Sequence, residues 1–158
     1  YPNERYVFGA PSYDYAERAE MLISLCYDFS VRIYDSIWGT RPYQLALQSG
    51  KIGFNRSILH DLNLRCFEIM AARRLLVTDT IPHLEHFHLY PGDHFIAYNT
   101  FYKPFFENFS FEYKRMAKSI EYFLTHDEIR QHIAEAGHEW VWTGNTWSHR
   151  AEHLLNMM

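Results

Sequence analysis

The sequence has little of what marks several classes of protein. Its 158 residues include only two cysteines, Cys26 and Cys66, which is too few for the disulfide framework of a small secreted domain. We therefore expect reduced thiols and a cytoplasmic location. No run of 18 or more apolar residues occurs, so we expect no transmembrane segment. No internal repeat or low-complexity segment is visible.

Positive charge and glycine are also scarce. Fifteen basic residues against 19 acidic ones give a net charge of −4, and no basic stripe is interleaved with aromatic residues. We therefore expect no nucleic-acid partner. None of the seven glycines forms a Gly-x-Gly-x-x-Gly loop, which argues against a Rossmann dehydrogenase or methyltransferase. Residues 8–11 contain no acidic cluster, which argues against a response regulator.

Hydrophobic residues, by contrast, are plentiful. They make up 47% of the chain, which excludes an intrinsically disordered protein. The length fits one domain over residues 1–158 with a full core. The first residue is Tyr1 rather than an initiator methionine, so we expect a piece of a longer protein.

Short apolar runs recur about every twenty residues and alternate with helical patterns. The expected strands lie near residues 6–8, 31–34, 52–54, 75–77 and 95–98. This alternation predicts an α/β fold with a doubly wound, Rossmann-like parallel sheet. The run at 75–77 is apolar throughout, as in a central strand that helices cover on both faces.

Helical patterns dominate the chain beyond Asn108 and predict a helical C-terminal part. Thr125 and Glu128 have the spacing of a capping box, and Gly137 is expected to end that helix. Trp140–Trp142 then reads as a brief extended piece, and Thr146 as the cap of a last helix. Near the other end, a stripe at helical spacing is expected to be buried: Ala16, Ala19, Leu22, Ile23 and Cys26.

Arg65 and Glu68 are the candidate binding residues that the pattern itself indicates. They lie three residues apart at the start of an expected helix, so both project to one side of it. The helix follows the strand at 52–54, which places both residues near the carboxyl ends of the strands. A cation and a carboxylate beside a helix N-terminus suit a phosphorylated ligand with hydroxyl groups. The alternative is an ordinary surface ion pair.

Three stretches together carry a family resemblance: Asn55–Asp79, Ile81–Glu85 and Phe95–Tyr98. They resemble the C-terminal nucleotide-sugar-binding domain of GT-B glycosyltransferases, of the spore-maturation-protein type related to the group-1 (family 4) enzymes. Those enzymes carry two glutamates eight positions apart, the second opening a Glu-x-x-Ala helix. Glu68-Ile-Met-Ala matches the second position, and His60 stands where the first glutamate would be.

The resemblance implies one half of a GT-B enzyme that transfers sugar from a nucleotide-diphosphate donor without a metal or another cofactor. The acceptor and any catalytic base would belong to a missing N-terminal half, so we expect this piece to be inactive alone. Glu68 would accept hydrogen bonds from the donor's ribose hydroxyls. Arg65 would grip the diphosphate and stabilise it as leaving group, unless it makes a structural ion pair.

Other donor-binding positions implied by the resemblance lie in loops. Asn55 matches a position that often carries Asn or Ser, although it could be a simple turn residue. His60 could touch a phosphate or the sugar, or be solvated. Gly9 would let the backbone approach the ligand. The segment from Tyr34 to Trp38 would contact the base, although Trp38 could equally belong to the core.

Several departures from the resembled family keep a second function open. Arg73 stands where the family usually has a glycine that permits a tight turn, and Thr80-Ile81 replaces its Gly-Gly. The basic pair that grips the donor phosphates in family-4 enzymes has no clear counterpart. The alternative is a non-catalytic, Rossmann-like interaction or regulatory domain derived from a glycosyltransferase.

Histidines offer a rival, metal-binding interpretation. His83, His86, His88 and His94 fall within a dozen residues, and imidazole is a common metal ligand. His83 and His86 lack a cysteine partner, however, and the resembled enzymes need no metal. We therefore expect no metal site. His149 and His153 on the last helix are expected to face solvent.

Overall fold

The structure is a computed structural model, and it describes residues 13–33, 40–57, 61–98 and 109–157. Within these ranges it contains three strands, six α-helices and one 3-10 helix, η1. In chain order the elements are α1 (Tyr13–Asp28), α2 (Thr40–Gln48), β1 (Ile52–Phe54), α3 (Leu64–Ala71), β2 (Leu75–Thr78), η1 (Leu84–Phe87), β3 (Ile96–Ala97), α4 (Phe109–Thr125), α5 (Asp127–Gly144) and α6 (Trp147–Asn156). No helix among the described residues is long and apolar enough to cross a membrane.

The three strands form one parallel sheet in the order β1-β2-β3. Ile52 pairs with Leu75 at one end of the first ladder, and Val77 pairs with Ile96 in the second. All four residues of β2 are buried. The sheet is therefore parallel, and its middle strand is the one that the apolar run predicted.

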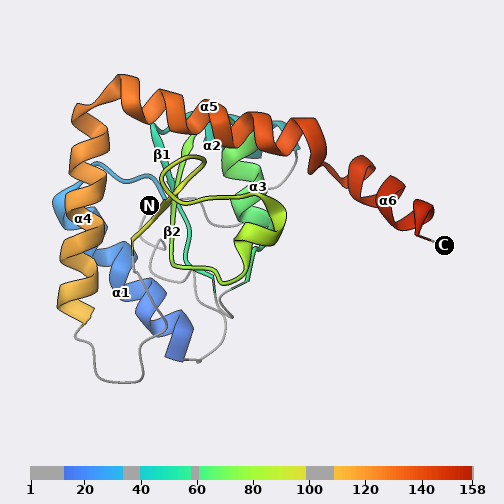
Figure 1. The fold of residues 1–158 in the computed structure, drawn as a ribbon. Helices are drawn as coiled ribbons and strands as arrows, with labels where there is room; N and C mark the ends of the chain where they lie inside the picture. Colours follow the sequence, from blue (N-terminus) through green and yellow to red (C-terminus); the bar gives the residue numbers. More distant parts are fainter. Residues whose placement is uncertain (1–12, 34–39, 58–60, 99–108, 158) are drawn as a thin grey trace.

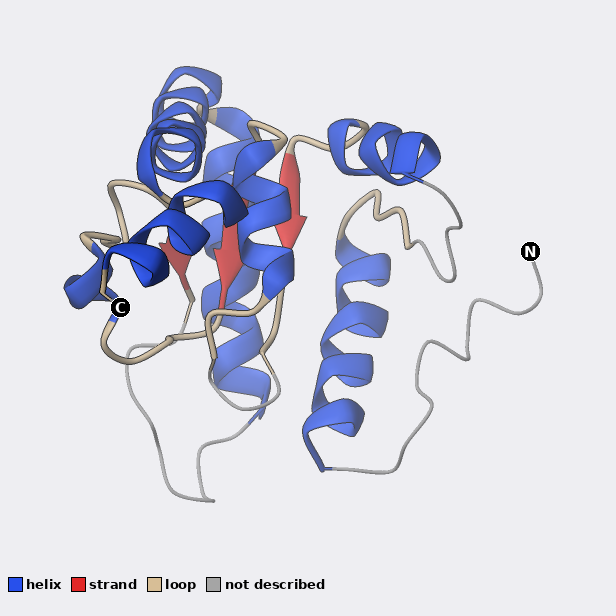
Figure 2. Cartoon of the chain, turned by 90° about the vertical axis from the view of Figure 1, so that its right-hand side faces the viewer, coloured by secondary structure: helices blue, strands red, loops and turns tan. Residues whose placement is uncertain are grey.

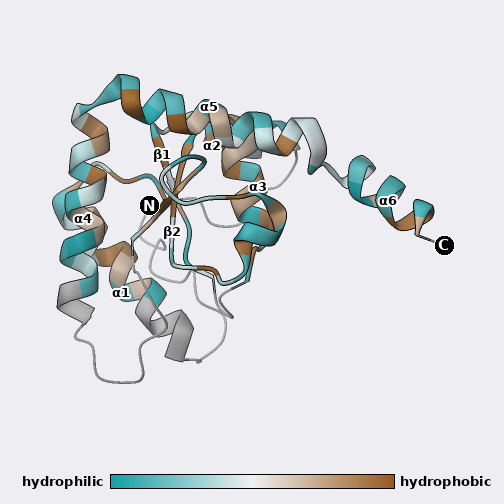
Figure 3. Ribbon diagram, viewed as in Figure 1, coloured by the Kyte–Doolittle hydropathy of each residue, from teal (hydrophilic) through white to brown (hydrophobic). Residues whose placement is uncertain are grey.

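Helices cover both faces of β2. Side chains of a strand point alternately to its two faces, and those of β2 enter two different core clusters. Leu75 and Val77 belong to a cluster with residues of α1, α4 and α5, such as Met21 and Met116. Leu76 belongs to the other cluster, with residues of α3 and α5. In Figure 2 the strands lie between helices, and Figure 3 shows strongly hydrophobic residues along β1 and β2. The chain is thus an α/β protein whose core lies on both sides of the sheet.

Helix α5 crosses the amino ends of all three strands (Figure 1). Near β1, the Lys51 Nζ lies 3.1 Å from the Asp127 carboxylate. Near β2, Arg73 pairs with Glu135 at 3.4 Å. Near β3, the His94 carbonyl oxygen would lie 2.5 Å from a Cβ placed on Gly137. Because α5 covers this edge of the sheet, the opposite, carboxyl edge is the one left for a site.

One expected strand is absent from the sheet. Residues 31–33 are described and form no strand, and the expected strand at 6–8 lies outside the described residues. Phe29 and Val31 are instead partly buried by packing against the α1–α4 side of the core. The apolar, β-branched residues of this segment therefore indicated burial correctly, but they do not form a strand. The strands at 52–54, 75–78 and 96–97 confirm the other three predictions.

The C-terminal helices begin and end at other residues than the pattern indicated. Helix α5 passes through Gly137 and ends at Gly144, so Gly137 does not end it, and Trp140–Trp142 is helical. The predicted capping box at Thr125 is also wrong, because the Thr125 hydroxyl bonds carbonyls within α4. Thr146 does cap α6, accepting a bond from the His149 N–H. Helix α6 has no buried residue, and its end extends outward (Figure 1), while Arg150 near its start lies over the rings of Phe67 and Phe87.

Arg73 takes the backbone conformation that the resembled family assigns to a glycine. Helix α3 ends in a Schellman motif, in which the Arg74 N–H bonds the Ile69 carbonyl and the Arg73 N–H bonds the Met70 carbonyl. The motif needs a left-handed residue at Arg73, whose φ is 55°. The tight turn before β2 is therefore kept with a non-glycine residue, at a cost in backbone energy.

We expect Arg73→Gly to raise the free energy of unfolding by about 0.5–1 kcal/mol. The glycine relieves the strain of the left-handed conformation, and its greater conformational entropy in the unfolded chain offsets part of that gain. Urea titration measures this change. Arg73→Ala is the control, because it removes the exposed pair with Glu135 and keeps the strain. If the alanine variant gains as much stability as the glycine variant, relief of backbone strain is not the explanation.

Gly137 allows α5 to approach the segment before β3. An added Cβ would also lie 3.3 Å from the Met70 side chain of α3. We therefore expect Gly137→Ala to destabilise the fold by about 1–3 kcal/mol through overpacking. Gly144→Ala in the same helix meets no atom within 4 Å, so it should be neutral or slightly stabilising. Equal effects of the two substitutions on the thermal midpoint would contradict this.

Candidate functional site

Polar residues follow β1 and β2 at the carboxyl edge of the sheet, and all of them are buried. Asn55, Arg56 and Ser57 come directly after β1, and Asp79 comes directly after β2. Ligands of open parallel sheets bind at this edge, in the crevice beyond the strand ends. This buried set of polar groups therefore lies where a ligand site of such a sheet is expected.

Asp79 is fully buried and fastens the β1 loop to the end of β2. Its Oδ1 accepts a hydrogen bond from the Ser57 N–H at 2.8 Å, and its Oδ2 accepts one from the Ser57 hydroxyl at 2.5 Å. The Thr78 hydroxyl also donates to Oδ1, at 3.1 Å. A buried carboxylate is tolerated only when it is hydrogen-bonded in this way. The loop after β1 is consequently fixed in place.

Asn55 is 1% exposed, and its side chain points into the protein. Its amide donates to the Thr78 hydroxyl at 3.1 Å and lies 3.4 Å from the Cys66 sulfur. Burial raises the pKa of the Cys66 thiol to about 12, and the nearby Asp79 carboxylate adds to the shift. This thiol therefore stays protonated. Through these contacts Asn55 links the end of β1 to β2 and α3.

Arg56 brings a buried positive charge to the same edge. Its guanidinium lies 3.7 Å from the Glu112 carboxylate of α4 and 3.5 Å from the Tyr98 hydroxyl. Tyr98 follows β3 and is itself buried; this burial raises the pKa of its hydroxyl well above the ordinary value. Arg56 thus links the ends of β1 and β3 to α4, on the side of the sheet opposite α3.

Arg65 and Glu68 lie together on the partly exposed side of α3, as the spacing predicted. The Arg65 Nε is 3.7 Å from Oε2 of Glu68. The Tyr43 hydroxyl of α2 donates to the same oxygen at 2.5 Å. Glu68 is 27% exposed and Arg65 45% exposed, so both remain accessible to a ligand. Among the described residues, no hydrogen bond to Oε1 of Glu68 is found.

Tyr43 is a site residue that sequence reasoning missed. Partial burial, together with the hydrogen bond to Glu68, raises its pKa to about 12. Its hydroxyl therefore remains a donor throughout the neutral range. No sequence signal marked it, since Tyr43 lies 25 residues from Glu68 and meets it only through the packing of α2 near α3.

Three further residues were missed although their positions carried a signal. Arg56, Ser57 and Asp79 directly follow predicted strands, where side chains of neighbouring strands meet. Four predicted positions, Gly9, Tyr34, Trp38 and His60, lie outside the described residues. Of the predicted donor-binding residues, the structure thus places Arg65 and Glu68 side by side and Asn55 in the interior.

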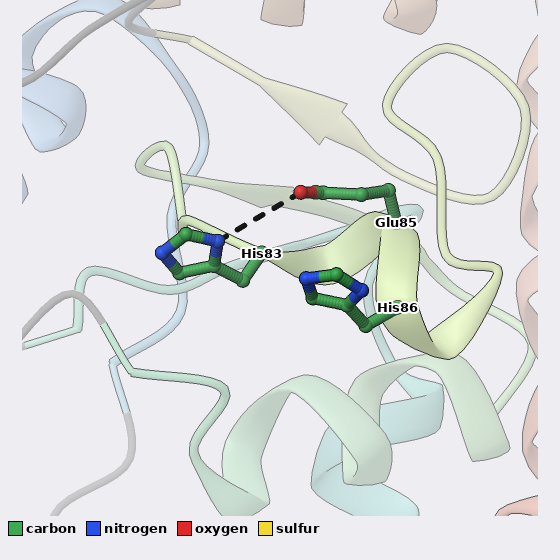
Figure 4. A group of neighbouring side chains, drawn as sticks. All are labelled: His83, Glu85 and His86. Carbon is green, nitrogen blue, oxygen red and sulfur yellow. Dashed lines mark ion pairs between the residues drawn. The ribbon is translucent and has the colours of Figure 1, made fainter.

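The structure divides the four clustered histidines into two groups. The ring of His94 accepts a hydrogen bond from the Tyr90 N–H, and the ring of His88 lies 3.5 Å from the Tyr90 hydroxyl. His83, at the N-cap of η1, and His86 in η1 converge with Glu85 on the surface (Figure 4).

Comparison with known proteins gives one finding. A family model described as "Glycosyl transferase-like" matches residues 6–156, almost the whole chain. Neither the curated proteins nor the solved structures that were compared give a match. A parallel α/β fold with polar residues at its carboxyl edge accords with that family, and the extent of the match establishes membership. The chain belongs to the glycosyltransferase-like family.

Proposed function

We propose that residues 1–158 form the donor-binding domain of a GT-B glycosyltransferase and hold the nucleotide part of an activated sugar. The observation that carries this proposal is the Arg65–Glu68 pair, accessible on α3 just beyond the carboxyl end of β1. The family match over residues 6–156 supports sugar transfer as the chemistry.

The Glu68 carboxylate is oriented to accept a hydrogen bond from a hydroxyl group. Its Oε2 is held by Tyr43 and Arg65, which leaves Oε1 to accept a hydrogen bond from a ribose hydroxyl. Tyr43 thereby acts as a positioning residue, because it fixes the orientation of the carboxylate before a ligand arrives.

Arg65 would bind the diphosphate and offset the negative charge that develops on it as the nucleotide leaves. It lies in the first turn of α3, where backbone N–H groups also attract anions. The Asn63 side chain, at the N-cap, accepts a hydrogen bond from the Cys66 thiol but none from a backbone N–H of that turn, so it does not cap those N–H groups. These groups supply the electrostatic part of transfer without a metal. A separate N-terminal half would bring the acceptor.

The second candidate is a non-catalytic interaction domain that retains the fold. The observation in its favour is that the side chains of Asn55 and Asp79 are buried and bond within the protein. Arg65 and Glu68 would then form only a surface ion pair. An interaction domain should bind no nucleotide diphosphate, so calorimetry with a panel of them separates the two candidates.

We expect Glu68→Ala and Arg65→Ala each to weaken binding of a nucleoside diphosphate by about 1–3 kcal/mol, as for hydrogen bonds to charged groups. The Arg65 effect should shrink at high salt and be small for the free nucleoside, because it acts on phosphate. The Glu68 effect should appear with both ligands, because it acts on ribose. Isothermal titration calorimetry measures all four combinations.

Glu139→Ala is the control for these variants, since Glu139 is an exposed acid of α5, which crosses the amino ends of the strands. It should leave nucleotide binding unchanged. If all three variants bind like the parent protein, the Arg65–Glu68 pair is structural and the donor-site proposal fails.

We expect Tyr43→Phe to weaken nucleoside binding by about 0.5–1.5 kcal/mol, because Glu68 loses the hydrogen bond that orients it. The loss of binding should be the same from about pH 6 to about pH 9, because the raised pKa of about 12 keeps the Tyr43 hydroxyl protonated over this range. Tyr27→Phe is the matched control on an 86% exposed ring. Unchanged or tighter binding by Tyr43→Phe would show that Tyr43 does not position Glu68.

A further inference from the structure

We propose that His83, Glu85 and His86 form a binding site for a divalent transition metal ion, best suited to Zn²⁺. Each residue offers one ligand atom, and these three atoms all lie within 4.8 Å of one another. Figure 4 shows the Glu85 carboxylate directed at the His83 ring, with the His86 ring beside it. The sequence alone argued against such a site because no cysteine accompanies the histidines, and the structure supplies a carboxylate in that role.

The backbone that carries these ligands is fixed by a tight turn. The Leu89 N–H bonds the Leu84 carbonyl at 3.2 Å and the His88 N–H bonds the Glu85 carbonyl at 3.0 Å, with His88 left-handed. Leu84 and Leu89 are both buried in the core on the α3 side of the sheet. Since Leu84 and Leu89 anchor the turn in the core, the exposed side chains of Glu85 and His86 are held on its outer surface.

The three side chains need to move only slightly to coordinate a metal ion. Ligand atoms at about 2.1 Å from a tetrahedral zinc ion are about 3.4 Å apart. His83 Nδ1 and Glu85 Oε1 are already 3.8 Å apart, and the two imidazole rings stack with centroids 5.9 Å apart. All three side chains are exposed, so rotations about their side-chain bonds can close the remaining gap without disturbing the core.

The ligand set selects the class of metal. Two imidazoles and one carboxylate suit Zn²⁺ and neighbouring transition ions, whereas Mg²⁺ and Ca²⁺ prefer oxygen ligands only. Three protein ligands leave at least one position for water. The ion would join residues 83 and 86 across η1 and so stabilise the connection between β2 and β3. This role is separate from the donor-binding proposal, since it uses neither Arg65 nor Glu68.

Another histidine pair supplies the matched control. His149 and His153 lie four residues apart on α6, a spacing that can also chelate a metal on a helix. The His149 Nδ1, however, lies 2.8 Å from the Thr146 hydroxyl and takes part in the cap of α6. We therefore expect the η1 site to bind Zn²⁺ more tightly than the α6 pair.

The test is titration of the purified chain, with any affinity tag removed, with Zn²⁺ and separately with Mg²⁺. We expect one Zn²⁺ per chain with a micromolar or lower dissociation constant, a higher thermal midpoint with Zn²⁺, and no response to Mg²⁺. His83→Ala/His86→Ala should weaken Zn²⁺ binding by at least about 10-fold, because even changes to residues around metal ligands cost that much. Glu85→Gln should weaken it as well, and His149→Ala/His153→Ala should not.

Circular dichroism of each variant checks folding, which these exposed substitutions should not alter. The proposal is overturned if the parent chain does not bind Zn²⁺, if binding survives in His83→Ala/His86→Ala, or if both double variants lose it equally. Nucleotide binding by the same variants reports on the donor site independently, so failure of one proposal does not resemble failure of the other.

Discussion

The rest of the structure depends on the crossing of α5 over the amino ends of the three strands. Gly137 allows the helix to lie against the backbone before β3, while Lys51 and Arg73 pair with its acidic residues before β1 and β2. Ile133 and Trp140 enter the core clusters on opposite faces of the sheet. One helix therefore joins both halves of the core and closes one edge of the sheet. The buried polar residues that directly follow β1 and β2 lie at the other edge.

That other edge contains two kinds of polar residue. Asp79 and Asn55 bond inward and fix the loop after β1, which leads to α3. Arg65 and Glu68 lie on α3 itself and remain accessible. Buried polar groups that are bonded in this way hold the backbone around them in place, and Asn55 also contacts Cys66 in the first turn of α3. The buried network is thus better understood as the support of a site than as the site.

Sequence reasoning succeeded where one local rule decided the outcome. The apolar run at Leu75 predicted the middle strand of the sheet, and all four residues of that strand are buried. It failed where packing overrode the local rule. Gly137 reads as a helix end but serves close contact, and Ile23 fits the apolar stripe of α1 yet is 56% exposed. Tyr43 could not be found at all, because only the folded chain brings it to Glu68.

The two interpretations of the Arg65–Glu68 pair differ in what they require of the groups around it. A partly exposed ion pair contributes little to stability, so a structural role alone gives no strong reason for a third group to join it. Here Tyr43 does join it, from another helix, and it loses part of its own hydration to do so. Both donors meet the same oxygen of Glu68, so the carboxylate is oriented without being saturated. An oriented carboxylate with a remaining acceptor, next to a cation and an uncapped helix start, is what a hydroxyl-bearing phosphorylated ligand requires.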